Sequence, residues 1–346
     1  MIGRNIKKYR LLVGLSLREM ANKLGVSHQT IKKYEDDIIT PTSSRLIEIA
    51  DVLNVDISEL VSVYEIPKLK FNTFRKKNSM TKSKQEGLFL LIEDEVGKYL
   101  EILDLANEKS EIEKDKWSYR VNDLEDIETI SLKVRKKLNV SKYEPLFDLT
   151  GKLEDNNFLI MNIDYDQDFD GFSEVIGNKA FIVLSSKGYE RNRFTLAHEL
   201  GHIVLDLDNE LSKKDIENYC NFFASCLYMP KEAMLSEFKF DDNSDPNNIS
   251  LFELFVLAEK YGVSLNAVIM RLANLNIISQ KKKEKLFKEL SINKLTNKQL
   301  KFINEEPTRR TKLILKLDNL KVISKSQTVM YLGTTINDYF NSKYCN

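Results

Sequence analysis

The feature that most constrains the fold is a pair of histidines four residues apart, in the segment His198-Glu199-Leu200-Gly201-His202. Residues i and i+4 lie on one face of an α-helix, so both imidazoles can reach a single metal ion. Glu199 can accept a proton from a water molecule on that metal. The flanking residues are largely apolar and predict a buried helix over 191–205, where two histidines and a glutamate need partners. The spacing indicates the metal-binding helix of a zinc peptidase.

A catalytic zinc ion needs a third protein ligand and an open position for water. The candidates that follow the histidines are Asp206, Asp208, Glu210, Asp215, Glu217 and Cys220. The first three lie at or just beyond the end of the metal-binding helix, where aiming back is awkward. Residues 215–227 predict a second helix, which would place Glu217 opposite both histidines if it runs antiparallel to the first. Cys220, one turn later, is the competing ligand, although its simpler role is a small residue packed in the core.

Composition favours a helical protein with a sizeable core. The chain has 346 residues, 42% of them apolar, with 12 glycines and 6 prolines, too few for a turn-rich all-β fold. No apolar stretch approaches the roughly 20 residues of a membrane span, and the first residues do not form a signal peptide. Cys220, Cys226 and Cys345 are an odd set without a Cys-x-x-Cys pair. We therefore expect a cytoplasmic protein without membrane contact.

The net charge of zero conceals a segregated pattern. Residues 1–34 hold eight Lys or Arg and one acid, whereas residues 35–65 hold one and eight. Residues 121–278 hold 16 basic and 27 acidic residues, and the tail 279–346 holds 15 and six. The pattern suggests that the two ends of the chain meet a polyanion, while the middle has another task.

The first 65 residues predict five short helices. Ser16 is the expected N-cap of the second, Gly25-Val26 forms a turn, and Ser27 caps a third helix over 28–35. A helix, a tight glycine turn and a helix make a helix-turn-helix, whose second helix lies in the DNA major groove.

This segment resembles the XRE (lambda-repressor-like) family. The matching residues are Ala21, Gly25, Val26, Ser27, Ile31, Glu35, Pro41, Ile49, Ala50 and Leu53. The resemblance implies that His28, Gln29 and Lys33 face base edges, and that Arg18, Thr30 and Thr42 contact phosphates. Gln29 can pair bidentately with adenine and Lys33 can donate to guanine. Asp37 stands where the family usually has glycine, so we expect a distorted turn after the third helix.

The middle of the chain predicts a helical linker over 66–120, followed by a peptidase domain over 121–235. The linker contains an apolar helix at about 84–107. This helix either pairs with its copy in a dimer or packs on the peptidase domain, and packing is favoured. Residues 158–161 and 180–184 predict strands, with 170–173 at a turn between them. We expect the second strand to be the sheet edge that pairs with an extended substrate.

The peptidase region resembles the ImmA/IrrE family of metallopeptidases. The matching residues are Asp170 to Phe172, Arg193 to His202, Glu217, Cys220, Asn221, Phe223, Ala224, Met229 and Pro230. The resemblance assigns Glu217 as the third metal ligand, in agreement with the helix argument. Cys220 stands where the family often has alanine. Tyr219, Tyr228 and Arg193 are alternatives for stabilising the oxyanion. Members of the family cleave helix-turn-helix repressors.

Residues 236–346 predict a helical C-terminal region. The segment 258–264 repeats the spacing of 21–27, which indicates a second helix-turn-helix-like unit over about 250–275. Its second helix is more apolar than a base-reading helix should be, so packing is favoured over DNA contact.

The sequence thus predicts a mainly α protein with a small β-sheet (α+β): a DNA-binding head, a linker, a zincin-like His-Glu-x-x-His peptidase and a helical tail. The expected function is a DNA-binding regulator that cleaves a helix-turn-helix repressor, or itself, to relieve repression in a mobile-element or stress response. In this reading Glu199 is the base and His198, His202 and Glu217 bind zinc. Manganese could replace zinc, and a homodimer is left open. The alternative is a repressor or antitoxin without peptidase activity, whose metal site is structural or sensory; Cys220 as a fourth ligand would favour it.

Overall fold

The computed structural model describes residues 2–63, 65–71, 80–165, 169–186, 189–208, 210–238, 249–292, 305–334 and 338–339. The chain folds into two compact units. Of the described residues, unit 1 holds those up to residue 109 and those from residue 308, and unit 2 holds those between 110 and 307. Within the described ranges, no helix has the length and apolar character that crossing a lipid bilayer requires.

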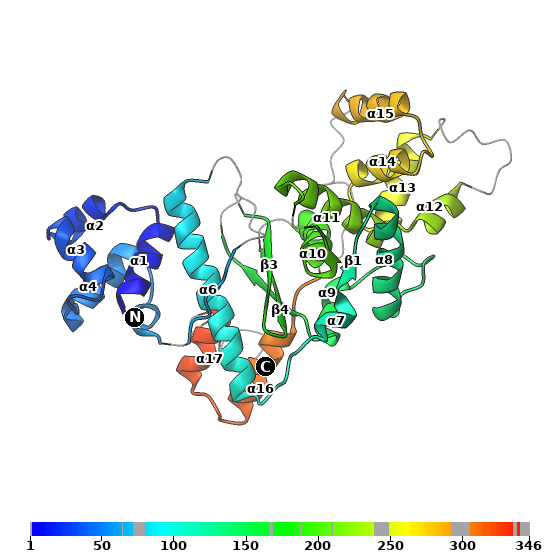
Figure 1. Ribbon diagram of the computed structural model, residues 1–346. Coiled ribbons are helices and arrows are strands. Elements are labelled where there is room, and N and C mark those ends of the chain that lie inside the picture. The colour runs from blue at the N-terminus through cyan, green and yellow to red at the C-terminus, as the bar shows by residue number, and fades with distance from the viewer. Residues whose placement is uncertain are drawn as a thin grey trace. The chain divides into compact units, whose positions relative to one another are not determined.

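Unit 1 is helical (Figure 1). Its elements are α1 (Ile2–Leu12), α2 (Leu17–Leu24), α3 (His28–Glu35), α4 (Ser43–Leu53), α5 (Ile57–Val61), α6 (Lys82–Leu105), α16 (Arg309–Asn319) and α17 (Lys325–Leu332). The first five helices surround one apolar core, which includes Ile6, Met20, Ile31, Ile49 and Leu60.

Local signals fix the helix-turn-helix as predicted. The Ser16 side chain accepts from the backbone N–H of Glu19, whose own side chain accepts from the N–H of Ser16. This reciprocal cap begins α2, and Gly25 ends it at φ 64° in the left-handed region that glycine adopts without strain. Ser27 then caps α3 through the N–H of Thr30.

Asp37 holds the turn after α3 in place. Asp37 itself adopts the left-handed conformation, with φ 52°. Its Oδ1 accepts a 2.8 Å hydrogen bond from the backbone N–H of Gly3, at the start of α1. The backbone N–H groups in the first turn of a helix have no acceptor within the helix, and the Asp37 carboxylate supplies one for Gly3. A glycine at position 37 could not do so.

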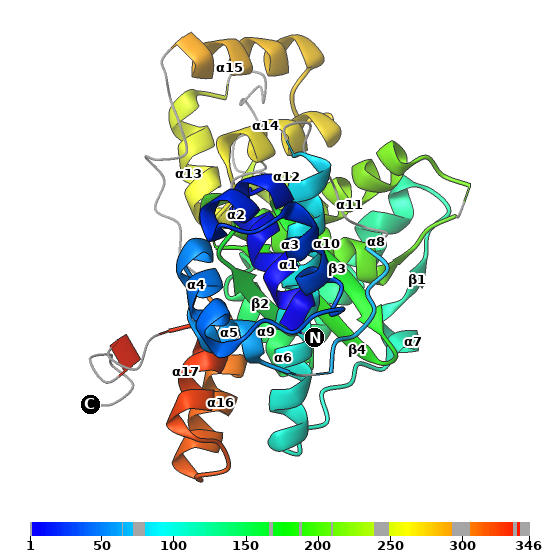
Figure 2. The same ribbon diagram turned by 90° about the vertical axis from the view of Figure 1, so that its left-hand side faces the viewer.

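Helix α6 packs on α1 and α16 inside unit 1, and Figure 2 shows α16 and α17 side by side. Its apolar stripe, including Leu88 and Val96, is buried as predicted. The partner is different: packing on the peptidase domain was favoured, whereas α6 belongs to the unit that holds the helix-turn-helix. Gly87 permits the approach, because a Cβ there would lie 2.9 Å from the Cβ of Leu11.

Unit 2 combines helices with two small sheets, so the predicted α+β class is confirmed. Its elements are α7 (Lys114–Trp117), β1 (Tyr119–Arg120), α8 (Leu124–Lys137), α9 (Leu149–Asp155), β2 (Leu159–Ile163), β3 (Gly171–Ile176), β4 (Lys179–Ser185), α10 (Tyr189–Val204), β5 (Leu205–Asp206), α11 (Lys213–Tyr228), α12 (Lys231–Glu237), α13 (Leu251–Tyr261), α14 (Leu265–Asn274) and α15 (Gln280–Ile292).

The larger sheet corrects two predictions. Its strand order is β2-β4-β3, with β4 parallel to β2 and antiparallel to β3. Residues 180–184 therefore form the central strand, paired on both sides, and cannot be the substrate-pairing edge. Residues 171–173, expected at a turn, begin the edge strand β3. Strand order depends on contacts between distant segments, which local alternation of apolar residues does not specify.

The second helix-turn-helix-like unit is formed by α13 and α14. Ser250 and Glu253 make the same reciprocal cap as Ser16 and Glu19, and Gly262 ends α13 at φ 62°. Helix α14 buries Val268, Ile269 and Leu272. Its Arg271 binds both carboxylate oxygens of Glu128 on α8, at 2.7 and 2.8 Å. The favoured packing role for this helix fits these contacts.

The unit boundaries differ from the predicted domains. The expected linker 66–120 and the expected C-terminal region 236–346 are each divided between the two units. An amphipathic stripe indicates that a helix face is buried, but it does not identify the surface that covers that face.

Candidate metal centre

Helix α10 presents both histidines on one side. Leu196, Ala197 and Leu200 are buried and fix the helix against the rest of unit 2, including β3 and β4. The two imidazole rings lie edge to face with centroids 4.9 Å apart, and their Nε2 atoms are 3.2 Å apart. The i, i+4 spacing thus brings two nitrogen donors to one point.

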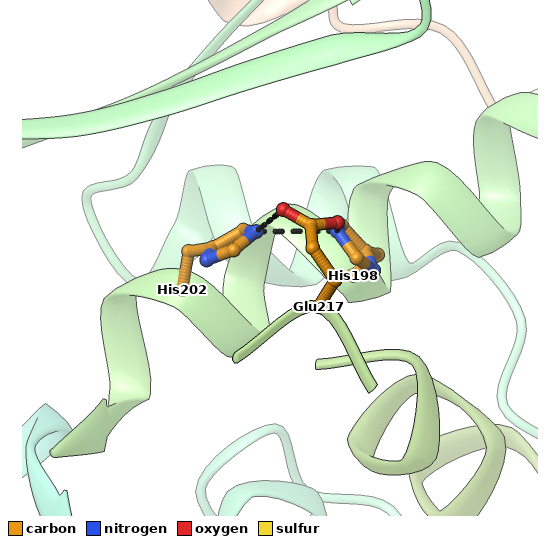
Figure 3. A group of neighbouring side chains, drawn as sticks. All are labelled: His198, His202 and Glu217. Atoms are coloured by element: carbon orange, nitrogen blue, oxygen red, sulfur yellow. Dashed lines mark hydrogen bonds and ion pairs between the residues drawn. The ribbon is translucent and has the colours of Figure 1, made fainter. Parts of the chain in front are cut away.

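Glu217 of α11 completes this group. Its carboxylate oxygens lie 3.3 Å from Nε2 of His198 and 3.7 Å from Nε2 of His202. Figure 3 shows the carboxylate between the two rings, facing them from a separate helix. In the described part of the chain these three side chains form the group whose donor atoms could hold a metal, all within 4.8 Å of one another. Two imidazoles and one carboxylate suit a catalytic zinc ion.

Gly201 lets α11 come close enough to deliver Glu217. A Cβ at this position would lie 3.2 Å from Cδ1 of Phe223 and 3.3 Å from Cα of Cys220. The glycine between the histidines is therefore needed for helix packing, since any side chain there would push against α11.

Cys220 lies behind His202 and away from the three converging donor atoms. Its Sγ is 3.4 Å from Nδ1 of His202, on the opposite side of the ring from Nε2. Burial raises the pKa of the Cys220 thiol well above its usual value, and the nearby Glu199 and Glu217 act in the same direction. This position fits a side chain that supports His202 better than it fits a competing ligand.

The first four acidic candidates lie elsewhere. Asp206 and Asp208 each approach Arg120 at 3.7 Å, and Glu210 is exposed. Asp215 is exposed in the first turn of α11, where it accepts a 2.6 Å hydrogen bond from the capping residue Ser212.

Glu199 occupies a buried position next to β3. Its Oε2 accepts a 2.7 Å hydrogen bond from the hydroxyl of Ser173, and a Cβ at Gly171 would lie 3.0 Å from its Oε1. Burial, together with the charges of Glu217 and Asp170, raises the pKa of Glu199 to about 7, although His198 and Ser173 oppose the shift. A carboxyl group with this pKa can both accept and return a proton near neutral pH.

The two histidines differ in their tendency to hold a proton. Burial lowers the pKa of His202 to about 4, with His198 adding to the effect, so this ring is neutral at pH 7. Burial also opposes protonation of His198, but its hydrogen bond to Glu217 and the charges of Glu199 and Glu217 raise its pKa overall.

Two of the three oxyanion candidates are engaged elsewhere. The Arg193 guanidinium donates to the carbonyl oxygens of Gly262 and Leu146 and pairs with Glu305. The Tyr228 hydroxyl donates to the carbonyl oxygen of Arg193 at 2.8 Å. Both side chains therefore stabilise the fold of unit 2.

Sequence reasoning gave no role to Ser173 and used Asn221 only as a motif residue. Ser173 was assigned to a turn, so its contact with Glu199 could not be foreseen. Asn221 follows Glu217 by four residues on one helix, a spacing that could have placed both side chains beside the histidines. Its Oδ1 lies 2.9 Å from Nδ1 of His198.

A groove of about 860 Å³ adjoins this group, between α8, α11 and α14. Asn221 and Phe194 line it, together with Asn218, Asn266, Met270 and Asn274. Asn221 thus both lines the groove and contacts His198. The asparagine amides of the groove offer hydrogen-bond donors and acceptors.

In unit 1, most of the predicted DNA-contacting side chains are exposed. Arg18, His28, Gln29, Lys33 and Thr42 are all accessible. Thr30 is partly buried and its hydroxyl lies 2.9 Å from that of Ser27, while Thr42 also caps α4. The face of α3 that carries His28, Gln29 and Lys33 is thus accessible to a DNA major groove.

Comparison with known families identifies both parts. Residues 6–60 match the helix-turn-helix family model, and residues 158–273 match the model of the IrrE N-terminal-like domain, a peptidase family. The chain is a helix-turn-helix protein with a peptidase-family domain. More particularly, it fuses an XRE-type helix-turn-helix to an ImmA/IrrE-type domain, as the sequence resemblances indicated. The second match extends beyond residue 235, the predicted end of the peptidase domain. No curated protein and no solved structure matches the chain.

Proposed function

We propose that this DNA-binding regulator carries a metal-dependent endopeptidase that relieves repression by cleaving a protein. The observation that carries the proposal is the placement of buried Glu199 beside His198, His202 and Glu217, within a domain that matches a peptidase family. Zinc is the proposed metal because of this donor set, and manganese could take the same ligands.

The chemistry divides between the metal and the protein. A bound zinc ion would lower the pKa of water toward roughly 7 and polarise the scissile carbonyl. Glu199 would accept the proton of the attacking water and pass it to the leaving amine. The Ser173 hydroxyl would hold the carboxylate in place through its 2.7 Å hydrogen bond.

The proposed substrate is a helix-turn-helix repressor or the chain itself. This choice follows the family resemblance. The proposed DNA partner is a double-stranded operator, read by His28, Gln29 and Lys33 and held at phosphates by Arg18, Thr30 and Thr42. A cytoplasmic location and a homodimer belong to the same proposal.

The test compares metal-loaded wild type with Glu199→Gln, each co-expressed with helix-turn-helix repressors, using mass spectrometry to find cut sites in the repressors and in the chain. Glu199→Gln keeps the metal ligands and removes the base, so cleavage should disappear. Glu210→Gln is the matched control, because Glu210 is exposed.

The alternative function predicts a different result. If wild type cuts neither protein while it binds metal and DNA, the metal site is sensory or structural and the peptidase proposal fails. A closed structural site would need a fourth protein ligand, and the position of Cys220 behind His202 gives that form of the alternative little support.

A further inference from the structure

Helix α11 contacts both imidazoles on two sides. Glu217 faces their Nε2 atoms, whereas Asn221 and Cys220 face their Nδ1 atoms. The spacing 217, 220 and 221 is i, i+3 and i+4, so one helical face delivers all three side chains. The chain therefore places a separate acceptor behind each histidine.

The Nδ1 contacts matter because of the tautomer that metal binding requires. A histidine that binds metal through Nε2 carries its proton on Nδ1, and that N–H orients the ring when it meets an acceptor. The Nε2 atoms are the ones that converge with Glu217, so each Nδ1–H would be a donor. The Asn221 amide oxygen and the Cys220 sulfur are the acceptors in reach.

The two acceptors are unequal. The amide oxygen of Asn221 lies 2.9 Å from Nδ1 of His198, an ordinary hydrogen-bond length. The Cys220 sulfur lies 3.4 Å from Nδ1 of His202, and a thiol is a weak acceptor. His198 should therefore be the more firmly oriented ligand.

We propose that Asn221 is a positioning residue that fixes the tautomer and direction of His198 for metal binding, and that Cys220 gives His202 a weaker form of the same support. The inference rests on the proposed function, since it concerns the same metal. Helix α11 would then supply the third ligand, Glu217, and also the two side chains that orient the histidines.

The test measures Co²⁺ and Zn²⁺ binding by the full chain, through competition with a chromophoric chelator and the visible absorption of the Co²⁺ form. Asn221→Leu should weaken binding by about 10- to 100-fold and alter the Co²⁺ spectrum. Asn221→Asp, which keeps an acceptor oxygen at the same reach, should restore affinity to the wild-type level or above it. Cys220→Ala should weaken binding less than Asn221→Leu.

Two matched controls lie on the same helix. Asn218 is an exposed asparagine, and Cys226 is a buried cysteine whose sulfur lies 3.3 Å from the Arg271 guanidinium. Asn218→Leu and Cys226→Ala should leave metal affinity unchanged. Circular dichroism verifies that each variant is folded.

The outcomes separate this inference from the function on which it rests. If Asn221→Leu binds metal like wild type, or if Asn221→Asp and Asn221→Leu weaken binding equally, the positioning role is wrong while the metal site stands. If folded wild type binds neither ion, the proposed metallopeptidase itself is overturned.

Discussion

Lys8 of α1 and Asp94 of α6 form an ion pair whose side chains are both fully buried. Arg4 contacts the other oxygen of the same carboxylate. Burial lowers the pKa of Lys8 even though Asp94 opposes the shift, so the pair depends on close contact to remain charged. This relationship joins the helix-turn-helix to α6 inside unit 1.

Replacing Asp94 should therefore destabilise unit 1 strongly. Asp94→Asn leaves the buried Lys8 without a counter-charge, and we expect a loss of about 3–5 kcal/mol in the free energy of unfolding. Denaturant unfolding followed by circular dichroism measures this loss. Glu86→Gln on the same helix is the control, because its partner Lys7 and Glu86 itself are both partly exposed. Equal stability of the two variants would contradict the prediction.

The ion pairs of Glu95 should make unit 1 sensitive to acid. Although burial opposes ionisation, Arg310 and Lys98 lower the pKa of Glu95 to about 2 in the folded protein, from an ordinary 4.5. The stabilisation is therefore present above about pH 4.5 and is lost as the pH falls through about 2. Glu95→Gln should cost on the order of 2–3 kcal/mol at pH 7 and progressively less below pH 4.5. Unfolding measured at several pH values tests this, and a cost independent of pH would refute it.

Glu199 should make the metal-free protein less stable at high pH. Its folded pKa of about 7 lies above the ordinary 4.5, so the folded state holds a proton that the unfolded state releases between these values. Stability should fall as the pH rises through this window. Metal-free Glu199→Gln should exceed wild type at pH 8 by on the order of 2–3 kcal/mol, with the difference vanishing toward pH 4.5. Thermal unfolding in chelator is the measurement, with Glu210→Gln as the unchanged control.

Gly201→Ala should loosen the metal centre without removing a ligand. The added methyl group would press on Phe223 and Cys220 at 3.2–3.3 Å, so α11 must shift by a few tenths of an ångström and carry Glu217 with it. We expect metal affinity to fall by about tenfold. Competition with a chelator measures the metal affinity of Gly201→Ala, with Asn218→Ala as the control. Equal affinities of the two variants would show that the close packing at Gly201 does not control metal binding.

Gln29→Ala should reduce operator selectivity at one base position. Gln29 is exposed on α3, and a bidentate amide contact with adenine contributes about 1–3 kcal/mol of discrimination. Lys32→Ala is the matched control, because Lys32 lies on the same helix and pairs with Asp36 at 2.7 Å. Selection of bound DNA from a random pool identifies the operator, and titration of single-base variants then tests whether Gln29→Ala alone relaxes one position.

Sequence reasoning succeeded where the signal is local. The caps at Ser16 and Ser27, the left-handed Gly25 and the histidine spacing each depend on neighbouring residues, and the structure has them as expected. Helical periodicity and the need for a third ligand left Glu217 and Cys220 as candidates, and the family resemblance favoured Glu217.

Long-range features could not be read in the same way. Nothing in the sequence marks Lys8 and Asp94 as buried partners, since charged residues on amphipathic helices are usually solvated. The order of the strands and the partner of α6 depend on which distant surfaces meet. The sequence left two roles open for Cys220, a metal ligand or a packed core residue, because its distance from His202 depends on how closely two helices pack.

The division of the chain into units has a consequence for proteolysis. Unit 2 is inserted in unit 1, and among the described residues the polypeptide passes between the units twice, near residue 109 and near residue 308. One cut at either passage would produce two fragments in a denaturing gel, yet α16 and α6 would still hold them together in native solution. Separating the peptidase-family domain from the helix-turn-helix takes two cuts, so a nicked molecule would keep both parts in a single particle.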